Sequence, residues 1–220
     1  MQENLSISKA TVDRLPRYYR CLRQLADEDV EIASSEELGR RLAINPEQIR
    51  KDLAFFGQFG KKGVGYYVTE LKESLGNILG LDHHWNVAII GMGHLGAALA
   101  NYQGIARLGF RLAAIFDANP VVIGTRVGER RVEDIAYLAE IIAERAIQIG
   151  VIAVPAAAAQ GVADRLVDAG IRGIWNFAPV KLQVPPSIAF VSEDLSVGLS
   201  SLSYYLTHTT EDEDDLSEKN

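Results

Sequence analysis

The sequence predicts an α/β chain in two parts, a small helical domain followed by a doubly wound parallel sheet. The sheet is predicted by residues 87–99, VAIIGMGHLGAAL, an apolar run with closely spaced glycines. From there to residue 179, apolar strand-like segments alternate with amphipathic helical ones, which is typical of a parallel sheet covered by helices. More than eighty residues precede this run, enough for a separate domain.

The composition is that of a globular protein, with 48% apolar and 23% charged residues. No stretch approaches the roughly 20 apolar residues of a membrane span, and the amino terminus lacks the apolar core of a secretory signal. We therefore expect a cytoplasmic protein with no membrane partner. Cys21 is the single cysteine, so no intrachain disulfide is expected, and His83 and His84 in a polar connector do not predict a metal site.

Charge is unevenly distributed along the chain, whose net charge is -7. Residues 211–220, EDEDDLSEKN, hold six acidic residues and one lysine, a composition that predicts a disordered tail. Between residues 40 and 62 the balance is reversed, with six basic residues against two acidic ones. A local basic patch is therefore expected within an acidic protein.

The first helix is expected around residues 12–25, where apolar residues recur at helical spacing: Val12, Leu15, Tyr18 or Tyr19, Leu22 and Leu25. Pro16 falls inside the pattern, so the helix either starts at this residue or kinks there. A shorter helix, EELGRRLA at residues 36–43, follows. Ser35 is its predicted N-cap, because a serine hydroxyl can accept a hydrogen bond from the free amides of the first turn.

A third helix, PEQIRKDLAFFG at residues 46–57, has Asn45 as its predicted cap and a proline at its first position. Its buried stripe is expected to be Ile49, Leu53 and Phe56. The opposite face and its flanks then carry Glu47, Gln48, Arg50, Lys51 and Ala54. Two short helices, the second with a basic outer face, predict a helix-turn-helix. The alternative is an amphipathic helix with a solvated face.

Residues 57–68, GQFGKKGVGYYV, are predicted to form a β-hairpin directly after these helices. The glycines allow tight turns, and residues 66–69, Tyr-Tyr-Val-Thr, favour a strand. Lys61 and Lys62 would lie at the tip, where two lysines suit a phosphate backbone or a minor groove. An ordinary hairpin with a soluble tip is the alternative. Behind a helix-turn-helix, the hairpin favours a winged-helix domain that binds DNA.

The glycines of the run at residues 87–99 match GxGxxG, the fingerprint of a dinucleotide-binding turn. Gly91 permits the turn, Gly93 lets a pyrophosphate approach the backbone, and Gly96 lets the next helix pack on the strand. We expect that helix at residues 97–108, followed by a strand that ends in Asp117. A carboxylate there can accept from ribose hydroxyls and would repel a 2′-phosphate, so NAD(H) is favoured over NADP(H).

Helices at residues 132–146 and 160–170 are expected to alternate with strands at 147–155 and 171–179, which predicts the second half of a Rossmann sheet. Val154 and Pro155 leave one strand, and Asn176 and Phe177 leave the other, at the edge where such sheets bind ligands. Asn176 is the candidate for the nicotinamide end. Alternatively, its side chain bonds the backbone of its own loop.

No acid or base is convincingly placed beside the predicted nicotinamide, and only about forty residues follow Asn176. They include a helix at residues 195–209 with a leucine seam that favours a packing or dimer surface: Leu195, Leu199, Leu202 and Leu206. We therefore predict that the chain is not an enzyme and that the cofactor acts as a signal.

The order of these motifs resembles the Rex family of redox-sensing transcriptional repressors. The similarity runs from about residue 8 to about residue 208 and rests on RLPRYYRCL, SSEELGRRL, IRKDLAFFGQFGKKGVGY, IIGMGHLGAAL, IFD, VP and GIWNFAPVKLQVP. The resemblance implies a homodimer that binds inverted-repeat operator DNA and is released when NADH binds. It also implies that the carboxy-terminal helix is exchanged between the two subunits.

Motifs and resemblance together assign the candidate residues. DNA contacts are expected from Ser35, Gln48, Arg50, Lys51, Lys61, Lys62 and Gly63. NAD(H) contacts are expected from Gly91, Met92, Gly93, His94, Leu95, Gly96, Asp117, Val154, Pro155, Asn176 and Phe177. Switch or dimer contacts are expected from Tyr102, Asp194, Leu199 and Leu202.

The predicted parts are a winged-helix domain at residues 1–80, a Rossmann domain at 81–193, a dimer-exchange helix at 194–208 and an acidic tail at 209–220. Two other functions remain open, an NAD-dependent dehydrogenase and a coenzyme A-binding Rossmann module. The second would leave Asp117 with little to bind.

Overall fold

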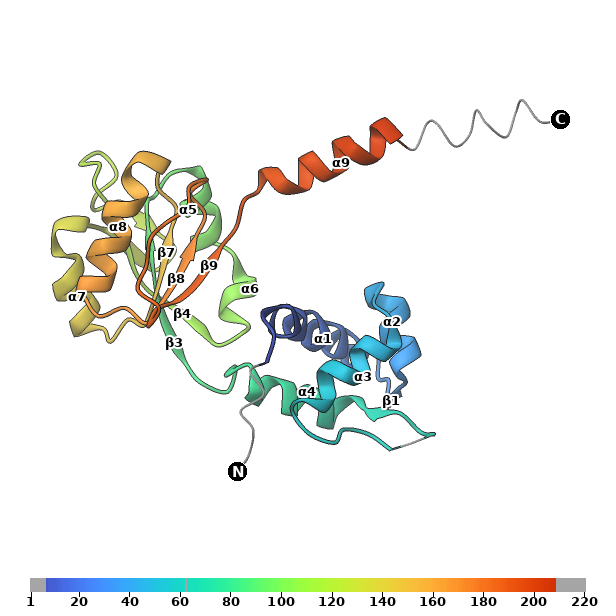
Figure 1. Cartoon of the computed structure of the whole chain (residues 1–220). Helices are drawn as coiled ribbons and strands as arrows, with labels where there is room; N and C mark the ends of the chain where they lie inside the picture. Colours follow the sequence, from blue (N-terminus) through green and yellow to red (C-terminus); the bar gives the residue numbers. More distant parts are fainter. Residues whose placement is uncertain (1–6, 62, 209–220) are drawn as a thin grey trace. The chain divides into compact units, whose positions relative to one another are not determined.

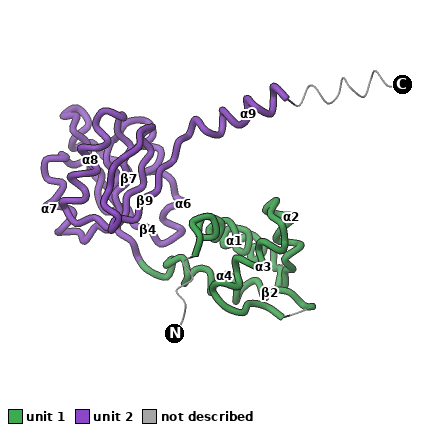
Figure 2. The backbone as a smooth tube through the Cα atoms, in the orientation of Figure 1, with its two compact units in different colours: residues 1–83 green, residues 84–220 purple. Residues whose placement is uncertain are grey.

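The computed structural model describes residues 7–61 and 63–208 (Figure 1). The chain divides into two compact units, residues 1–83 and residues 84–220 (Figure 2). Lys62 and the predicted acidic tail lie outside the described residues. Within the described ranges, no helix is long and apolar enough to cross a membrane.

Unit 1 is mostly helical and contains one two-stranded antiparallel sheet. Its elements are α1 (Lys9–Asp27), β1 (Ile32–Ala33), α2 (Ser35–Leu42), α3 (Pro46–Ala54), β2 (Tyr66–Tyr67) and α4 (Val68–Ile78). The apolar stripe of α1 is buried in one core with side chains of α2, α3 and α4. Val12 was predicted in that stripe but is 45% exposed, because Thr11, one position earlier, is the buried residue of this turn.

The first helix begins earlier than predicted. Ser8 is its N-cap, and its hydroxyl oxygen accepts from the Thr11 amide at 3.1 Å. Because this cap starts α1 at Lys9, Pro16 lies inside the helix, and a start at Pro16 is wrong.

The cap of α2 is Ser34, not Ser35. The Ser34 hydroxyl oxygen accepts from the Glu37 amide at 3.1 Å, and Ser35 is the first helical residue. Two adjacent serines are equally suited to the role by type, and the extended backbone of Ser34 decides between them. The cap of α3 is confirmed, since the Asn45 side-chain oxygen accepts from the Glu47 amide at 2.8 Å.

The predicted hairpin is smaller than expected. β2 pairs with β1, with Ile32 opposite Tyr67 and Ala33 opposite Tyr66, instead of pairing within its own loop. Residues 68 and 69 begin α4 and are not strand, because Val68 is fully buried in the helical core. We call residues 57–65 the wing loop, which an isolated bridge between Lys61 and Gly65 closes.

Unit 2 is built on a seven-stranded sheet in the order β5-β6-β4-β3-β7-β8-β9. The strands are β3 (Trp85–Ile90), β4 (Phe110–Asp117), β5 (Arg126–Val127), β6 (Arg130–Asp134), β7 (Ile149–Ile152), β8 (Gly173–Asn176) and β9 (Ala189–Ser192). Only the β5–β6 pair is antiparallel. The six parallel strands, renumbered along the chain, have the spatial order 3-2-1-4-5-6 of the dinucleotide-binding sheet.

The helices of unit 2 are α5 (His94–Ala100), α6 (Gln103–Ala106), α7 (Leu138–Glu144), α8 (Ala156–Asp168) and α9 (Ser196–His208), with a 3-10 turn at Ile135–Tyr137. Alternate residues of β3 face opposite sides of the sheet. Ala88 and Ile90 are buried against α7 and α8, whereas Val87 and Ile89 pack toward α5. Helices therefore lie on both faces of the sheet (Figure 1).

Two predicted helices of unit 2 are wrong in part. The helix expected at residues 97–108 is split into α5 and α6, because the Asn101 side-chain amide donates to the Ala97 carbonyl at 2.8 Å and closes the first segment. Residues 132–134 belong to β6, although they were expected in a helix. The parallel pairing with β4, which places Val132 opposite Ile115, holds these residues in the extended conformation.

Candidate functional site

The outer face of α3 is exposed and carries the predicted DNA-contacting lysine. Lys51 is 66% exposed, and its amine forms an ion pair with Glu47 at 2.9 Å, one turn away. This contact lowers the pKa of the Glu47 carboxyl. An exposed pair of this kind contributes little to stability, so Lys51 can exchange Glu47 for a phosphate.

Arg50 lies on the flank of α3 that faces α2. Its guanidinium donates to the Ser35 hydroxyl at 2.5 Å and to the Glu36 carboxylate at 3.0 Å. Ser35, a predicted DNA contact, is only 7% exposed and orients Arg50. Glu36, in the first turn of α2, is therefore the counter-ion of a predicted DNA-contacting residue.

The wing loop stands beside this flank. A Cβ at Gly60, whose φ is +75°, would lie 2.4 Å from the Gly65 carbonyl oxygen, so the turn requires glycine there. Gly63, a predicted contact, has open space around it. The Lys61 amine lies 5.4 Å from the centre of the Tyr67 ring. The loop therefore presents its backbone at Gly63 and the Lys61 amine to a binding partner.

A buried charge network holds α3 against α1. Asp52 of α3 has a fully buried side chain, and its two carboxylate oxygens accept from Arg14 at 2.6 and 2.8 Å. Tyr18 donates at 2.6 Å and Gln48 at 2.8 Å. Burial alone would raise the pKa of Asp52, but the hydrogen bonds from Arg14, Tyr18 and Gln48 outweigh it and lower the pKa to about 2.

This network also orients a predicted DNA contact. A carboxylate only accepts hydrogen bonds, so Gln48 must turn its amide nitrogen toward Asp52. The sequence pattern does not identify Arg14, Tyr18 and Asp52 as supports of α3. The signal that the sequence offers is Asp52 itself, a carboxylate one position before Leu53 of the buried stripe.

In unit 2, the glycine turn has the geometry that the fingerprint requires. Gly91 has a φ of +100°, and a Cβ there would lie 2.5 Å from the Ala153 carbonyl oxygen. A Cβ at Gly96 would lie 1.8 Å from the Gly91 carbonyl oxygen, so only glycine lets the helix pack on the turn. At Gly93 no atom lies within 4 Å of an added Cβ. This open space in front of α5 fits a pyrophosphate.

Asp117 is brought to the same turn from the end of β4. One carboxylate oxygen accepts from the Met92 amide at 2.6 Å, and the other accepts from the Asn119 amide at 2.8 Å. The carboxylate therefore lies at the edge of the glycine turn, where the ribose of a dinucleotide would be bound.

The remaining predicted cofactor residues are spread along the same sheet edge. Val154 follows β7 and lies beside the turn, 2.8 Å from a Cβ placed on Gly91, with Pro155 next in the chain. Met92 is in the turn, and His94 and Leu95 open α5. Phe177 follows β8 and packs on Trp175 with ring centres 4.5 Å apart.

Asn176 serves its own loop, as the alternative in the sequence analysis has it. Its side chain is fully buried. The amide nitrogen donates to the Ala178 carbonyl and the Ser192 hydroxyl, both at 3.0 Å, and the side-chain oxygen accepts from the Ala178 amide at 3.0 Å. The side chain is therefore buried and held by its own loop and by Ser192.

The four predicted switch or dimer residues lie on the surface of unit 2. Tyr102 is 64% exposed, and Leu199 and Leu202 are 70% and 52% exposed. The Asp194 carboxylate accepts from the Ser196 amide and hydroxyl at the start of α9, and these bonds lower the pKa of Asp194. Among the described residues, no hydrogen bond joins Tyr102 to Asp194.

Two family models match the chain. Residues 6–54 match a model described as a putative DNA-binding protein N-terminus, and residues 82–180 match one described as a CoA binding domain.

Curated relatives cover nearly the whole chain. A redox-sensing transcriptional repressor Rex of Clostridium perfringens (strain SM101) is 44% identical over 208 residues, covering 94% of this chain and 98% of the relative. The Rex repressor of Chloroflexus aurantiacus (strain J-10-fl) is 47% identical over 200 residues, covering 91% and 94%.

Solved structures give the same likeness. The structure of RSP in complex with beta-NAD+ and operator DNA is similar with a TM-score of 0.87 at 42% identity, covering 97% of this chain and 99% of that one. RSP in complex with beta-NADH is similar with a TM-score of 0.86 at 41% identity, covering 98% and 99%.

Proposed function

The chain belongs to the Rex family of redox-sensing transcriptional repressors, and on this premise we propose that it represses transcription by binding operator DNA under the control of NADH. One observation carries the proposal: a single chain joins a recognition helix that exposes Arg50 and Lys51, with a wing loop, in unit 1 to an open glycine cradle beside Asp117 in unit 2. The first is suited to DNA, and the second to a dinucleotide.

Within unit 1, we assign the DNA contacts to α3 and the wing loop. Lys51 and Arg50 lie on the exposed face and flank of α3, each held by one acidic neighbour that a phosphate can replace. Gln48, Lys61, Lys62 and Gly63 complete the assignment, and Ser35 acts by orienting Arg50.

Within unit 2, the proposed NAD(H) contacts are the turn from Gly91 to Gly96, Asp117, Val154, Pro155 and Phe177. The open space at Gly93 and the position of Asp117 support this assignment. We omit the Asn176 side chain, because its polar groups bind its own loop.

The ligand acts as a signal in this proposal and the chain is not an enzyme, in keeping with relatives that are named repressors. NADH and NAD+ differ by a positive charge on the nicotinamide, so a site shielded from water favours the neutral reduced ring. Only a difference in affinity between two states can move an equilibrium. A preference of about 100-fold for the DNA-released state would contribute about 2.7 kcal/mol per site.

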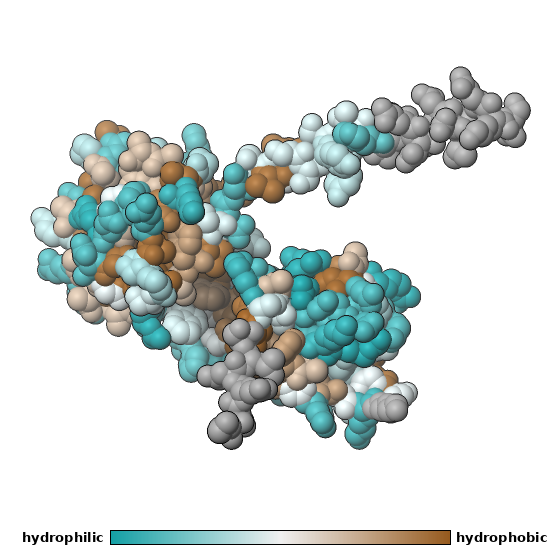
Figure 3. Space-filling view, in the orientation of Figure 1, coloured by the Kyte–Doolittle hydropathy of each residue, from teal (hydrophilic) through white to brown (hydrophobic). Residues whose placement is uncertain are grey.

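We propose that the working species is a homodimer, formed by exchange of α9. No side chain of α9 is buried within its own chain, and hydrophobic side chains lie open near its start (Figure 3). Leu195, Leu199 and Leu206 are 66%, 70% and 69% exposed. A row of exposed leucines is typical of a surface that another chain covers. A second copy would also match an inverted-repeat operator.

A coenzyme A-binding module is the second candidate, favoured by the family model that matches residues 82–180. The position of Asp117 beside the glycine turn argues for a ribose instead. Titration calorimetry with NADH and with coenzyme A separates the two, and we expect heat only from NADH. A cytoplasmic location is part of the main proposal, because a repressor must reach its operator.

The deciding experiment is fluorescence anisotropy of the protein on a labelled inverted-repeat duplex from its own promoter regions, titrated with NADH and separately with NAD+. We expect release by NADH and not by NAD+. DNA binding that responds to neither would overturn the proposed control, and no binding to any duplex would overturn the repressor function.

A further inference from the structure

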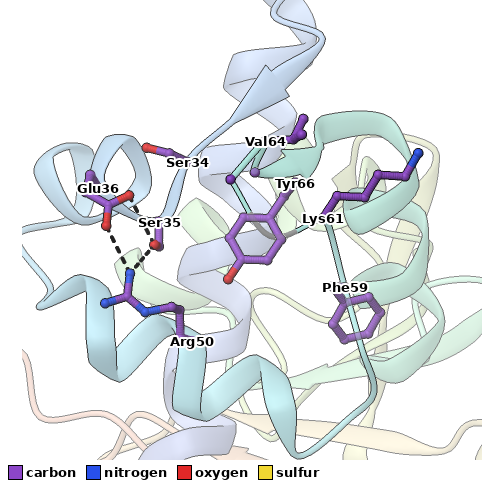
Figure 4. Close-up of a pocket in the computed structure, with 10 residues that line it drawn as sticks. Ser34, Ser35, Glu36, Arg50, Phe59, Lys61, Val64 and Tyr66 are labelled. Atoms are coloured by element: carbon purple, nitrogen blue, oxygen red, sulfur yellow. Dashed lines mark hydrogen bonds and ion pairs between the residues drawn. The ribbon is translucent and has the colours of Figure 1, made fainter.

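Unit 1 contains a groove of about 500 Å³ between the start of α2, the flank of α3 and the wing loop (Figure 4). It is lined by Ser34, Ser35, Glu36, Arg50, Phe59, Lys61, Gly63, Val64, Gly65 and Tyr66. Because these residues come from three separate parts of unit 1, the groove was not recognisable in the sequence.

The side of the groove formed by α2 is built to hold an anion. The first amides of a helix have no acceptor within the helix and carry partial positive charge. The Glu36 carboxylate already uses this position, and its pKa is lowered chiefly by its own backbone amide and then by Arg50. Glu36 is 67% exposed, so an external anion can displace it.

Tyr66 contributes a second, independent feature. Its side chain is only 8% exposed, and its hydroxyl points into the groove toward the side where Ser35 and Arg50 lie (Figure 4). Burial raises the pKa of this hydroxyl, which therefore remains a protonated donor at neutral pH. The described residues offer it no hydrogen-bond acceptor. In the part of the chain that the structure describes, no side-chain nitrogen or oxygen is both buried and without a partner, so this hydroxyl is open to the groove, where a ligand can supply its acceptor.

We propose that this groove binds a phosphate group of the DNA backbone, with the Tyr66 hydroxyl donating to a phosphate oxygen that displaces Glu36 from Arg50. The inference deepens the proposed function and rests on it. It assigns to DNA binding a residue that lies after the wing loop, on β2, and that has no charge.

The proposal has a distinctive consequence for DNA binding. A neutral donor adds affinity without displacing a counterion, so its loss leaves the salt dependence of binding unchanged. Contact with a phosphate carries no sequence information, so its loss weakens operator and unrelated duplexes by the same factor. Because the hydrogen bond is made to a charged group, we expect its removal to lower the affinity for DNA about tenfold.

The test compares full-length wild type, Tyr66→Phe and Tyr67→Phe by anisotropy on the operator duplex and on a scrambled duplex, over a series of KCl concentrations. Tyr67 is the matched control, because it is the neighbouring tyrosine and does not line the groove. We expect Tyr66→Phe to bind both duplexes about tenfold more weakly, with an unchanged dependence of affinity on salt. Tyr67→Phe should bind both duplexes as wild type does. Thermal melting should be unchanged in Tyr66→Phe, because the deleted hydroxyl has no partner among the described residues.

Several outcomes decide against the inference. Equal affinities of wild type and Tyr66→Phe for both duplexes would overturn it while leaving the proposed function intact. A loss of affinity confined to the operator duplex would show that Tyr66 contacts a base and not a phosphate. If wild type binds no duplex, the proposed function fails and the inference fails with it.

A further experiment adds inorganic phosphate at constant ionic strength. Phosphate that displaces DNA from wild type and not from Tyr66→Phe would support the site and identify free phosphate as a second ligand.

Discussion

Replacing Asp52 with asparagine tests the network that holds α3 on α1. Asparagine keeps the shape of the side chain and removes the charge that Arg14 and Tyr18 bind. The pKa of Asp52 is about 2 against an ordinary 3.8. At about 1.36 kcal/mol per pKa unit, the ionised form stabilises the fold by about 2 kcal/mol relative to the neutral form. We expect Asp52→Asn to destabilise unit 1 by about that amount at pH 7.

The sign of the pH dependence follows from the lowered pKa. The stabilisation is fully present above the unfolded pKa of 3.8 and is lost as pH falls toward the folded value of about 2. The difference between wild type and variant should therefore be constant from pH 7 to about pH 5 and should shrink below pH 4.

Hydrogen exchange of peptides that cover α3 measures the difference at pH 7, and thermal melts followed by circular dichroism extend it to pH 2.5. Asp13→Asn is the matched control, because Asp13 lies on α1, is 56% exposed and, among the residues that the structure describes, pairs with Lys9 alone. Equal protection of α3 in wild type and Asp52→Asn would contradict a stabilising role of the Asp52 charge, as would a difference that stays constant down to pH 2.5.

Three further predictions concern the DNA face, the cofactor turn and the dimer. Lys51→Ala should weaken binding to all duplexes and reduce the salt slope by about one, and an effect at a single operator base would contradict a phosphate contact. Gly93→Val should abolish NADH binding in calorimetry at an unchanged melting temperature, whereas Gly96→Ala should lower the melting temperature, because its Cβ meets the backbone at 1.8 Å. Leu199→Ser with Leu202→Ser should weaken the dimer by about a hundredfold or more in sedimentation, at about 1.5–3 kcal/mol per buried leucine, and an unchanged dimer would exclude α9 from the interface.

Much of the fold could be predicted because its signals are local. Asn45 and Pro46 start α3 as expected, since capping depends on a residue and the next two or three amides. The glycine turn was also recognisable, because Gly91, Gly93 and Gly96 have the spacing of the GxGxxG fingerprint. The strand that ends in Asp117 follows it at the expected distance. The N-cap of α2 was wrong because two local solutions compete there, Ser34 and Ser35.

The edges of the elements in unit 2 depended on contacts from elsewhere in the chain. Residues 132–134 have a helical pattern but become strand β6, because β4 offers them a ladder of hydrogen bonds. Asn176 was a reasonable ligand contact by its position after β8. Its actual partners include Ser192, sixteen residues further on, which no local pattern identifies.

Helix capping, hydrophobic periodicity and turn chemistry act over a few neighbouring residues, so the order of amino acids is enough to predict the two folds, the glycine turn and the basic residues that could meet DNA. Which charges are paired and which polar groups are left open depends instead on contacts between segments that are distant in the sequence. Asp52 meets Arg14 across 38 residues, and Arg50 meets Ser35 across 15. Tyr66 reaches the same groove from β2. Such partners depend on how the helices pack, and packing is a property of the whole unit.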